Sequence, residues 1–262
     1  MYSKTQKALA ETLGTAALVL VGPGSVVAAL VLAGKSVPAI TAADLLGISF
    51  AFGLIITALV YAIGKVSGCH INPAVTFALA VTKKMPWADV PLYWASQFVG
   101  AVIGAAGIWA VFGQRAIDLG MGQTSYGDAT SLLSAAGAEF IGTALLMFAI
   151  LGIVDSKSPG DLAGIVIGGV VIAIIMVIGP ITGASLNPAR AFGPQLISAI
   201  AGGPTHWVQY IPVYLVPGFV GAAAAAFTYD FLANPRLVET PIKRAVTEAD
   251  DVSRDIPAPA PV

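Results

Sequence analysis

Long runs of uncharged, mostly apolar residues occupy most of this chain of 262 residues. A helix needs about 20 such residues to cross a bilayer core of about 30 Å, and several of the runs are at least that long. The hydrophobic pattern therefore predicts six membrane-spanning helices. Their expected positions are residues 9–33, 43–66, 90–112, 131–154, 162–180 and 208–231.

Two further apolar stretches, residues 67–82 and 183–199, are too short to cross a membrane. Segments of this length are expected to be re-entrant or interfacial where they enter the bilayer. The first long run follows Lys4 and Lys7, as the apolar core of a signal peptide would, but its length favours a retained helix. The predicted fold class is an all-α membrane protein with six transmembrane helices and two re-entrant half-helices.

The composition narrows the class of protein. The chain is 57% hydrophobic and 10% charged, whereas soluble proteins average about 25% charged residues. A net charge of −1 argues against a nucleic-acid binder that acts through a basic surface, and a single cysteine argues against a secreted disulfide scaffold. Nine of the 27 charged residues lie in the last 27 positions. We therefore expect residues 1–231 to form the membrane domain and residues 232–262 to be a disordered tail.

The basic residues between the predicted spans indicate how the chain is oriented. With six spans and an inner N-terminus, ten lysines and arginines lie on the inner side and three on the outer side. The inner ten are Lys4, Lys7, Lys65, Lys83, Lys84, Lys157, Arg236, Lys243, Arg244 and Arg254, and the outer three are Lys35, Arg115 and Arg190. The positive-inside rule then predicts a multi-pass protein of the cell membrane with both termini in the cytoplasm.

An internal repeat relates the two halves of the predicted membrane domain. The sequence AETLGTA at residues 10–16 returns as AEFIGTA at 138–144, and GCHINPAVTF at 68–77 returns as GASLNPARAF at 183–192. The two repeats extend over about residues 7–112 and 131–231. Because each half has three spans, an odd number, the second half is inverted in the bilayer. Sites in such proteins form from discontinuous helices at the interface between the repeats.

The Asn-Pro-Ala triplet stands in both copies of the second motif. The two triplets are Asn72, Pro73 and Ala74, and Asn187, Pro188 and Ala189. Asn is a preferred N-cap and Pro is favoured at the first helical position, so one isolated copy would indicate only that a helix begins there. Two copies in short segments of an inverted repeat indicate two half-helices that enter from opposite faces. Each spans about 15 Å, so their N-termini would meet near the centre of the bilayer.

The predicted junction between the half-helices has a distinct chemistry. Helix N-termini carry unpaired N–H groups and a partial positive charge, which disfavours cations. The amides of Asn72 and Asn187 can both donate to the oxygen of one water molecule, which turns its hydrogens outward and interrupts a proton relay. Non-helical backbone before each Asn can offer carbonyl acceptors to a file of small hydroxylic molecules. The expected acceptors belong to Cys69, His70, Ile71, Gly183 and Ser185.

These motifs carry a resemblance to a known family. The segments SGCHINPAVT and TGASLNPARAFGP, together with the repeated Glu11 and Glu139, resemble the aquaporin, or major intrinsic protein, family over about residues 7–231. The resemblance implies a right-handed bundle of six helices and two half-helices, one pore per subunit and a homotetramer. It also implies a passive water channel that excludes ions and protons, with no cofactor and no enzymatic activity.

The resemblance also indicates which residues select the solute. By their offset from the motifs, Phe52, Ile175, Ala184 and Arg190 correspond to the outer constriction of the family. Strict water channels have a histidine at the place of Ile175. Glycerol facilitators have an aromatic residue at the place of Ala184 and an aspartate at that of Ala191. The set most resembles an archaeal-type filter, which predicts water passage with some permeability to small neutral solutes.

The remaining polar residues of the spans are assigned structural roles. Glu11 and Glu139 are expected to be buried acceptors for the re-entrant loops, and His70 is expected to brace its loop rather than to gate. Two histidines and one cysteine make no zinc-type cluster. The expected partners are water, small neutral solutes and the lipid bilayer, without nucleic acid. A glycerol facilitator of the same family is the main alternative, and an ion-coupled transporter is a weaker one because the spans hold so few ionisable groups.

Overall fold

The computed structural model describes residues 2–34 and 40–233, and every element within these ranges is helical. Residues 1–230 form one compact unit. Its long helices are α1 (Lys4–Leu32), α2 (Ala42–Ser67), α4 (Val90–Phe112), α6 (Leu132–Val154), α7 (Ala163–Thr182) and α10 (Val216–Ala233). The shorter elements are α3 (Pro73–Val81), η1 (Trp87–Asp89), α5 (Gln114–Asp118), η2 (Gly120–Gly122), η3 (Gly160–Leu162), α8 (Pro188–Ile200), α9 (Trp207–Gln209) and the π-helical η4 (Tyr210–Leu215).

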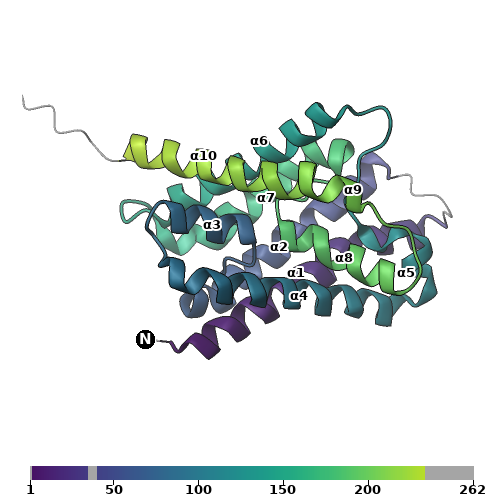
Figure 1. Ribbon diagram of the computed structural model, residues 1–262, viewed down its shortest axis with the longest axis horizontal. Helices are drawn as coiled ribbons and strands as arrows, with labels where there is room; N and C mark the ends of the chain where they lie inside the picture. Colours follow the sequence, from purple (N-terminus) through teal and green to yellow (C-terminus); the bar gives the residue numbers. More distant parts are fainter. Residues whose placement is uncertain (1, 35–39, 234–262) are drawn as a thin grey trace, which may run out of the picture. The chain divides into compact units, whose positions relative to one another are not determined.

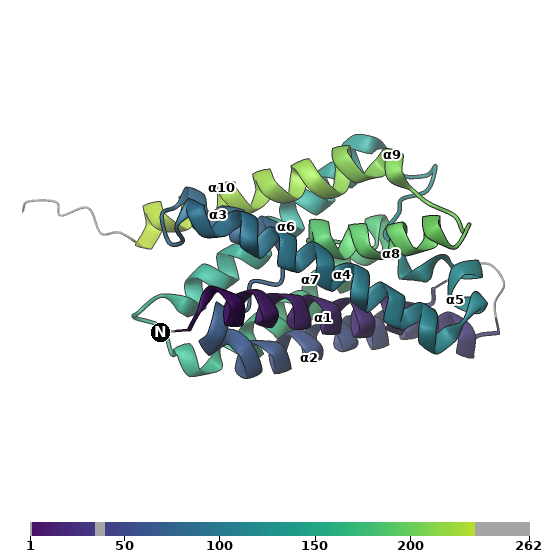
Figure 2. The same ribbon diagram turned by 60° about the horizontal axis from the view of Figure 1, so that its bottom comes forward.

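The six predicted spans correspond to six helices that are long and apolar enough to cross a membrane within the described ranges. The last of these combines α9, η4 and α10 into one continuous segment, Trp207–Ala233. The two half-helices of the expected fold class are α3 and α8, which lie in line along the bundle in both views (Figures 1 and 2). The charged tail that we expect beyond residue 231 lies outside the described residues from position 234 onward.

The boundaries of α1 differ from the sequence prediction by several residues. The helix begins at Lys4, whereas the apolar pattern placed the start at residue 9. Ser3 and Gln6 form a capping box, in which each side chain accepts a hydrogen bond from the backbone N–H of the other. This local cap extends the helix into a polar segment that a hydrophobicity pattern does not detect.

The short helices α5 and η2 were not predicted from the sequence. They lie between the third and fourth spans, in a segment interrupted by Arg115 and Asp118. Helices of three to five residues have no long apolar period to reveal them. In η2, Met121 has a positive φ of 56° and is fully buried, so tertiary packing holds this turn in place.

Close helix crossings hold the bundle together. Helix α1 packs against α4 and α2, α2 packs against α7, and α8 packs against α4 (Figures 1 and 2). A Cβ atom at Gly100 or Gly104 of α4 would collide with the carbonyl oxygen of Thr12 or Ala16 in α1. Small residues at these crossings let the helix backbones approach closely, which is how membrane helices gain packing energy without a hydrophobic driving force.

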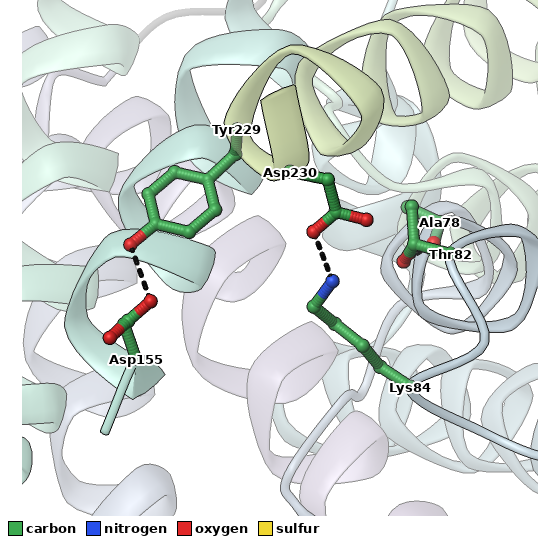
Figure 3. Close-up of polar contacts among 6 residues, drawn as sticks. All are labelled: Ala78, Thr82, Lys84, Asp155, Tyr229 and Asp230. Atoms are coloured by element: carbon green, nitrogen blue, oxygen red, sulfur yellow. Dashed lines mark hydrogen bonds and ion pairs between the residues drawn. The ribbon is translucent and has the colours of Figure 1, made fainter. Parts of the chain in front are cut away.

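Two polar contacts connect one end of α10 to other segments of the chain. Lys84, which follows α3, forms an ion pair with Asp230, and the Tyr229 hydroxyl donates a hydrogen bond of 3.1 Å to Asp155 at the end of α6 (Figure 3). Residues that are far apart in sequence are thereby joined at the same end of the bundle.

Candidate functional site

The half-helices α3 and α8 begin with the same capping arrangement. The Asn72 side-chain oxygen accepts a hydrogen bond of 2.9 Å from the Ala74 N–H, and the Asn187 oxygen accepts from the N–H of Ala189 at 3.0 Å and of Arg190 at 3.2 Å. A proline occupies the first turn of both helices. Each Asn-Pro pair therefore starts a helix for the local reasons that the sequence indicated.

The same two asparagines also join the halves of the molecule. The Asn72 amide nitrogen donates to the Leu186 carbonyl at 2.8 Å, and the Asn187 amide nitrogen donates to the Ile71 carbonyl at 2.8 Å. Each amide nitrogen has two N–H groups, so one remains for a passing molecule. Each asparagine therefore offers a single N–H, rather than its whole NH₂ group, to a water molecule at the junction. The Ile71 carbonyl, expected as an acceptor for solute, already accepts from Asn187.

Two buried carboxylates hold the loops that precede the half-helices. Glu11 accepts four hydrogen bonds, from the Ser67 hydroxyl, the Gln97 amide and the N–H groups of His70 and Ile71, at 2.6–2.9 Å. Both carboxylates are at most 1% exposed. The hydrogen bonds compensate for the desolvation of the buried carboxylate, and they also give the N–H groups of the loop a partner.

The second carboxylate has a nearly equivalent set of partners. Glu139 accepts from the Thr182 hydroxyl at 2.6 Å and from the N–H groups of Ser185 and Leu186, both at 2.8 Å. Because these N–H groups are bound on one side, the adjoining peptide carbonyls are turned toward the other side. The two loops thus have the same construction, as the repeated motif implies.

The loop backbone has strained conformations at matching positions. Cys69 and Ile71 have φ values of 51° and 44°, and Ala184 and Leu186 have values of 45° and 55°. Residues with side chains rarely adopt positive φ, and such strain persists only where the surroundings enforce it. Here the hydrogen bonds to the carboxylates supply that enforcement.

The sequence reasoning did not assign several residues that support the loops. Cβ atoms at Gly14 and Gly142 would collide with the side chains of Ile71 and Leu186, so these glycines make room for the residue before each asparagine. Both glycines belong to the repeated motif with Glu11 and Glu139, which is the signal that could have identified them. Tyr93 and Tyr214 also act in parallel, because their hydroxyls donate to the carbonyls of Ser67 and Thr182 at 2.7 and 3.0 Å.

His70 has a defined partner in its own half-helix. Its Nδ1 lies 3.1 Å from the Thr76 hydroxyl oxygen, which also contacts the Asn72 carbonyl at 3.1 Å and receives a hydrogen bond from Gln97. The single hydroxyl proton of Thr76 serves the Asn72 carbonyl, so we assign the imidazole proton to Nδ1. The Nε2 atom of His70 is then an acceptor.

A cavity of about 270 Å³ runs through the site. Its lining includes the following predicted residues: Phe52, Cys69, His70, Ile71, Asn72, Ile175, Ala184, Ser185, Asn187 and Arg190. Gly183, predicted with them, lies instead in the wall of a second cavity of about 600 Å³, together with Gly122 and His206. Arg190 and Ala184 line the first cavity. Gly122, which binds Arg190, and Gly183, which precedes Ala184, line the second, so Arg190 and Ala184 lie at the boundary between the two cavities.

Arg190 brings the only arginine charge in this cavity wall among the described residues. It is 2% exposed, and its Nη1 donates a hydrogen bond of 3.0 Å to the Gly122 carbonyl. Its guanidinium carbon lies 5.2 Å from the centre of the Phe52 ring, a cation–π distance. The Arg190 Nε is buried and has no hydrogen-bond partner in residues 2–34 and 40–233. Gly122 was missed because the short helix that holds it was missed.

The repeat shows that the charge of Arg190 has no counterpart in the other half of the chain. The offset that relates Asn72 to Asn187 also relates the four predicted constriction residues to four others, all of which line the same cavity. These four are Val60, Cys69, Val75 and Ile167. None carries a charge, so the wall has a guanidinium at Arg190 and an uncharged side chain at the equivalent position in the other half.

Comparisons with known proteins agree with this geometry. The family model described as "Major intrinsic protein" matches residues 1–229. Aquaporin AqpM of Methanothermobacter marburgensis is 42% identical over 246 residues, covering 89% of this chain and 100% of the relative. The probable aquaporin AqpM of Archaeoglobus fulgidus is 43% identical over 237 residues, covering 86% of this chain and 96% of the relative. The X-ray structure of the aquaglyceroporin from Plasmodium falciparum superposes with a TM-score of 0.78 at 26% identity, covering 93% of this chain and 100% of the other.

Proposed function

This chain belongs to the major intrinsic protein family and is a passive membrane channel for water or small solutes, and we propose which of these it conducts. It conducts water together with small neutral solutes such as glycerol. The proposed path runs through the cavity lined by both asparagines and by Arg190. The proposed selectivity filter consists of Phe52, Ile175, Ala184 and Arg190. The membrane domain of residues 1–231 carries this activity.

The observation that carries the proposal is the pairing of Arg190 with Phe52 in the cavity wall. The guanidinium offers N–H donors to a hydroxyl or water oxygen, while Phe52 and Ile175 present apolar surface to carbon atoms. A small methyl side chain at Ala184 leaves space that an aromatic residue would fill. A molecule with both hydroxyl groups and a short carbon chain is therefore compatible with this wall, as is water.

Exclusion of ions and protons follows from the same groups. A cation that enters would approach the Arg190 charge and then the partial positive charges of two helix N-termini, after losing much of its hydration. A water molecule at the junction can accept one N–H from Asn72 and one from Asn187. Its hydrogens then point away from the junction, which interrupts proton transfer along the file.

An ion-coupled transporter is less consistent with the site. Coupling requires an ionisable group that can exchange its partner during transport. Among the described residues, Glu11 and Glu139 are held by four and three hydrogen bonds to the loops, and Arg190 is held by Gly122. A glycerol facilitator remains the alternative within the family. The two differ in whether water or glycerol passes faster.

Assembly and location extend the proposal. We propose a homotetramer in the cell membrane with one pore per subunit and both termini in the cytoplasm. The family supports the tetramer, and the excess of lysine and arginine on one side of the spans supports the orientation.

Stopped-flow measurements on proteoliposomes test the proposed solutes. We expect water flux well above that of empty vesicles, with measurable glycerol flux. The variant Ile175→His is expected to lower the ratio of glycerol to water permeability because it replaces apolar surface, which suits a carbon chain, with a polar ring. Ala184→Phe tests the space beside residue 184, and Ala199→Phe, at an exposed helix position outside the cavity lining, serves as the control. Water flux equal to that of empty vesicles would refute the proposal.

A further inference from the structure

One turn of α1 lies directly behind the proposed filter without lining the pore. At Gly22, a Cβ atom would lie closer than van der Waals contact to three carbon atoms of the Phe52 ring. Gly22 is not among the residues that line the cavity, whereas Phe52 is. The Phe52 ring therefore separates α1 from the cavity at this level, resting on the bare backbone of Gly22.

The main chain of Phe52 has no room to retreat from α1. The next residue, Gly53, packs against α7 so closely that a Cβ atom there would lie 2.6 Å from the Gly168 carbonyl oxygen. The position of α2 is thus set by its crossing with α7. A group added at residue 22 must be accommodated by the Phe52 side chain, and the open space available to that side chain is the cavity.

Arg190, whose guanidinium lies over the Phe52 ring, is also supported by this turn of α1. Gly122, whose carbonyl binds Arg190, packs against the backbone of Pro23 so that a Cβ atom at residue 122 would lie 2.8 Å from the Pro23 carbonyl carbon. Gly122 has a positive φ of 65°, which favours glycine. Arg190 is therefore anchored through Gly122 to Pro23, in the same turn of α1 that supports the Phe52 ring.

The repeat offers an internal comparison. The position equivalent to Gly22 in the second half is Ile150, and the position equivalent to Phe52 is Ile167. Both isoleucines border the cavity. The first half thus pairs a glycine with a large ring, whereas the second half has two isoleucines of medium size at the equivalent positions. The small residue in α1 is matched to the large residue that it supports.

We propose that Gly22 is a specificity-determining positioning residue, which sets the width of the filter by fixing how far the Phe52 ring projects into the cavity. The proposal rests on the proposed function, because it takes Phe52 and Arg190 as the filter. Gly22 touches no solute and acts through the Phe52 ring. The position of the ring then determines how wide a neutral solute can be and still pass the filter.

The test is the ratio of glycerol to water permeability in proteoliposomes, because a ratio does not depend on how much protein is inserted. Gly22→Ala is expected to lower this ratio about fivefold relative to the wild type, since about 1 kcal/mol added to one barrier changes a rate by that factor. Gly24→Ala is the matched control in the same helix. A Cβ atom there would meet only Ile108, at an ordinary contact distance of 3.6 Å.

A second pair of variants isolates the ring. In a Phe52→Leu background the added methyl group has no ring to displace, so Gly22→Ala is expected to change the ratio less than twofold. A smaller ratio for Gly22→Ala that is lost in this background supports the proposal. Equal ratios for Gly22→Ala and Gly24→Ala overturn it.

The same variants separate this inference from the proposed filter. If Phe52→Leu itself leaves the ratio unchanged, the assignment of Phe52 to the filter is wrong. If Phe52→Leu changes the ratio and Gly22→Ala does not, only the role of Gly22 is wrong. Should Gly22→Ala fail to fold, recovery of folded protein in the double variant identifies the ring as the obstacle and supports the contact, whereas failure of the double variant counts against it.

Discussion

Asn72 and Asn187 are joined by crossed hydrogen bonds, because each donates its amide to the carbonyl of the residue that precedes the other, at 2.8 Å in both directions. Each also caps its own half-helix. Each asparagine side chain thus has three roles: it caps its own half-helix, it binds the loop before the other half-helix, and it retains one N–H for the pore. The junction is held from within rather than by the surrounding spans alone.

The crossed bonds predict the effect of Asn72→Ala on stability. The variant loses an N-cap, which is worth about 1 kcal/mol. It also leaves the buried Leu186 carbonyl unpaired, at a cost of about 1–3 kcal/mol. Thermal unfolding in detergent is expected to show a clear loss, and water permeability per folded channel is expected to fall. A variant as stable as the wild type would contradict the assigned role of the crossed bond.

Glu139→Gln tests the carboxylate that supports the second loop. Three donors converge on its two oxygens, so replacing one oxygen by an NH₂ group places a donor against a donor. We expect the variant to lose about 1–3 kcal/mol of unfolding free energy. Asp161→Asn, at an exposed position in η3, is the control for the change of a carboxylate to an amide. Equal unfolding temperatures for the two variants would show that Glu139 does not hold the loop.

Arg190→Met keeps much of the side-chain volume and removes the charge. Cations are then opposed only by the helix N-termini and by their own dehydration. We expect the variant to remain permeable to water while its vesicles dissipate an imposed ion gradient faster than wild-type vesicles do. Fluorescent potential-sensitive dyes report this rate. An unchanged ion leak would assign ion exclusion to the asparagine junction instead.

The end of α6 predicts a dependence of stability on pH. The Lys157 backbone N–H and the Tyr229 hydroxyl donate to Asp155 and hold the pKa of its carboxyl below the ordinary value. This stabilisation is present above the unfolded pKa of about 3.9 and is lost as the pH falls through the lower folded pKa. Asp155→Asn is therefore expected to unfold more readily than the wild type at neutral pH, with a difference that vanishes in acid. A difference that persists unchanged in acid would argue against this origin.

The ion pair between Lys84 and Asp230 is expected to contribute little to stability (Figure 3). Both side chains are about one-third exposed, and such pairs are worth about 0–1 kcal/mol because water and salt screen them. Lys84→Met should therefore shift the unfolding temperature only slightly, and added salt should shift the wild type in the same direction. A large loss of stability would mean that the pair is better shielded than its exposure indicates.

The order of the elements could be predicted from the sequence because each carries a local signal. Twenty or more apolar residues define a span, and Asn-Pro starts a half-helix wherever it lies in the chain. The repeat added the inverted arrangement, since three spans per half leave no other option. The start of α1 at Lys4 and the helices α5 and η2 carry no such apolar signal, and the pattern misplaced or missed them.

The order of the residues is enough to show that the chain lies in a lipid bilayer, where its spans run and which polar residues interrupt them: two asparagines, two glutamates and one arginine. The hydrogen bonds and packing contacts of these residues follow from the folded arrangement of the helices. The bond from Asn72 to Leu186 joins residues 114 positions apart, and the support of Phe52 by Gly22 depends on the distance between two helices. Neither depends on spacing along one helix. Such contacts arise when two helix surfaces meet, and their geometry follows from the packing of the whole bundle.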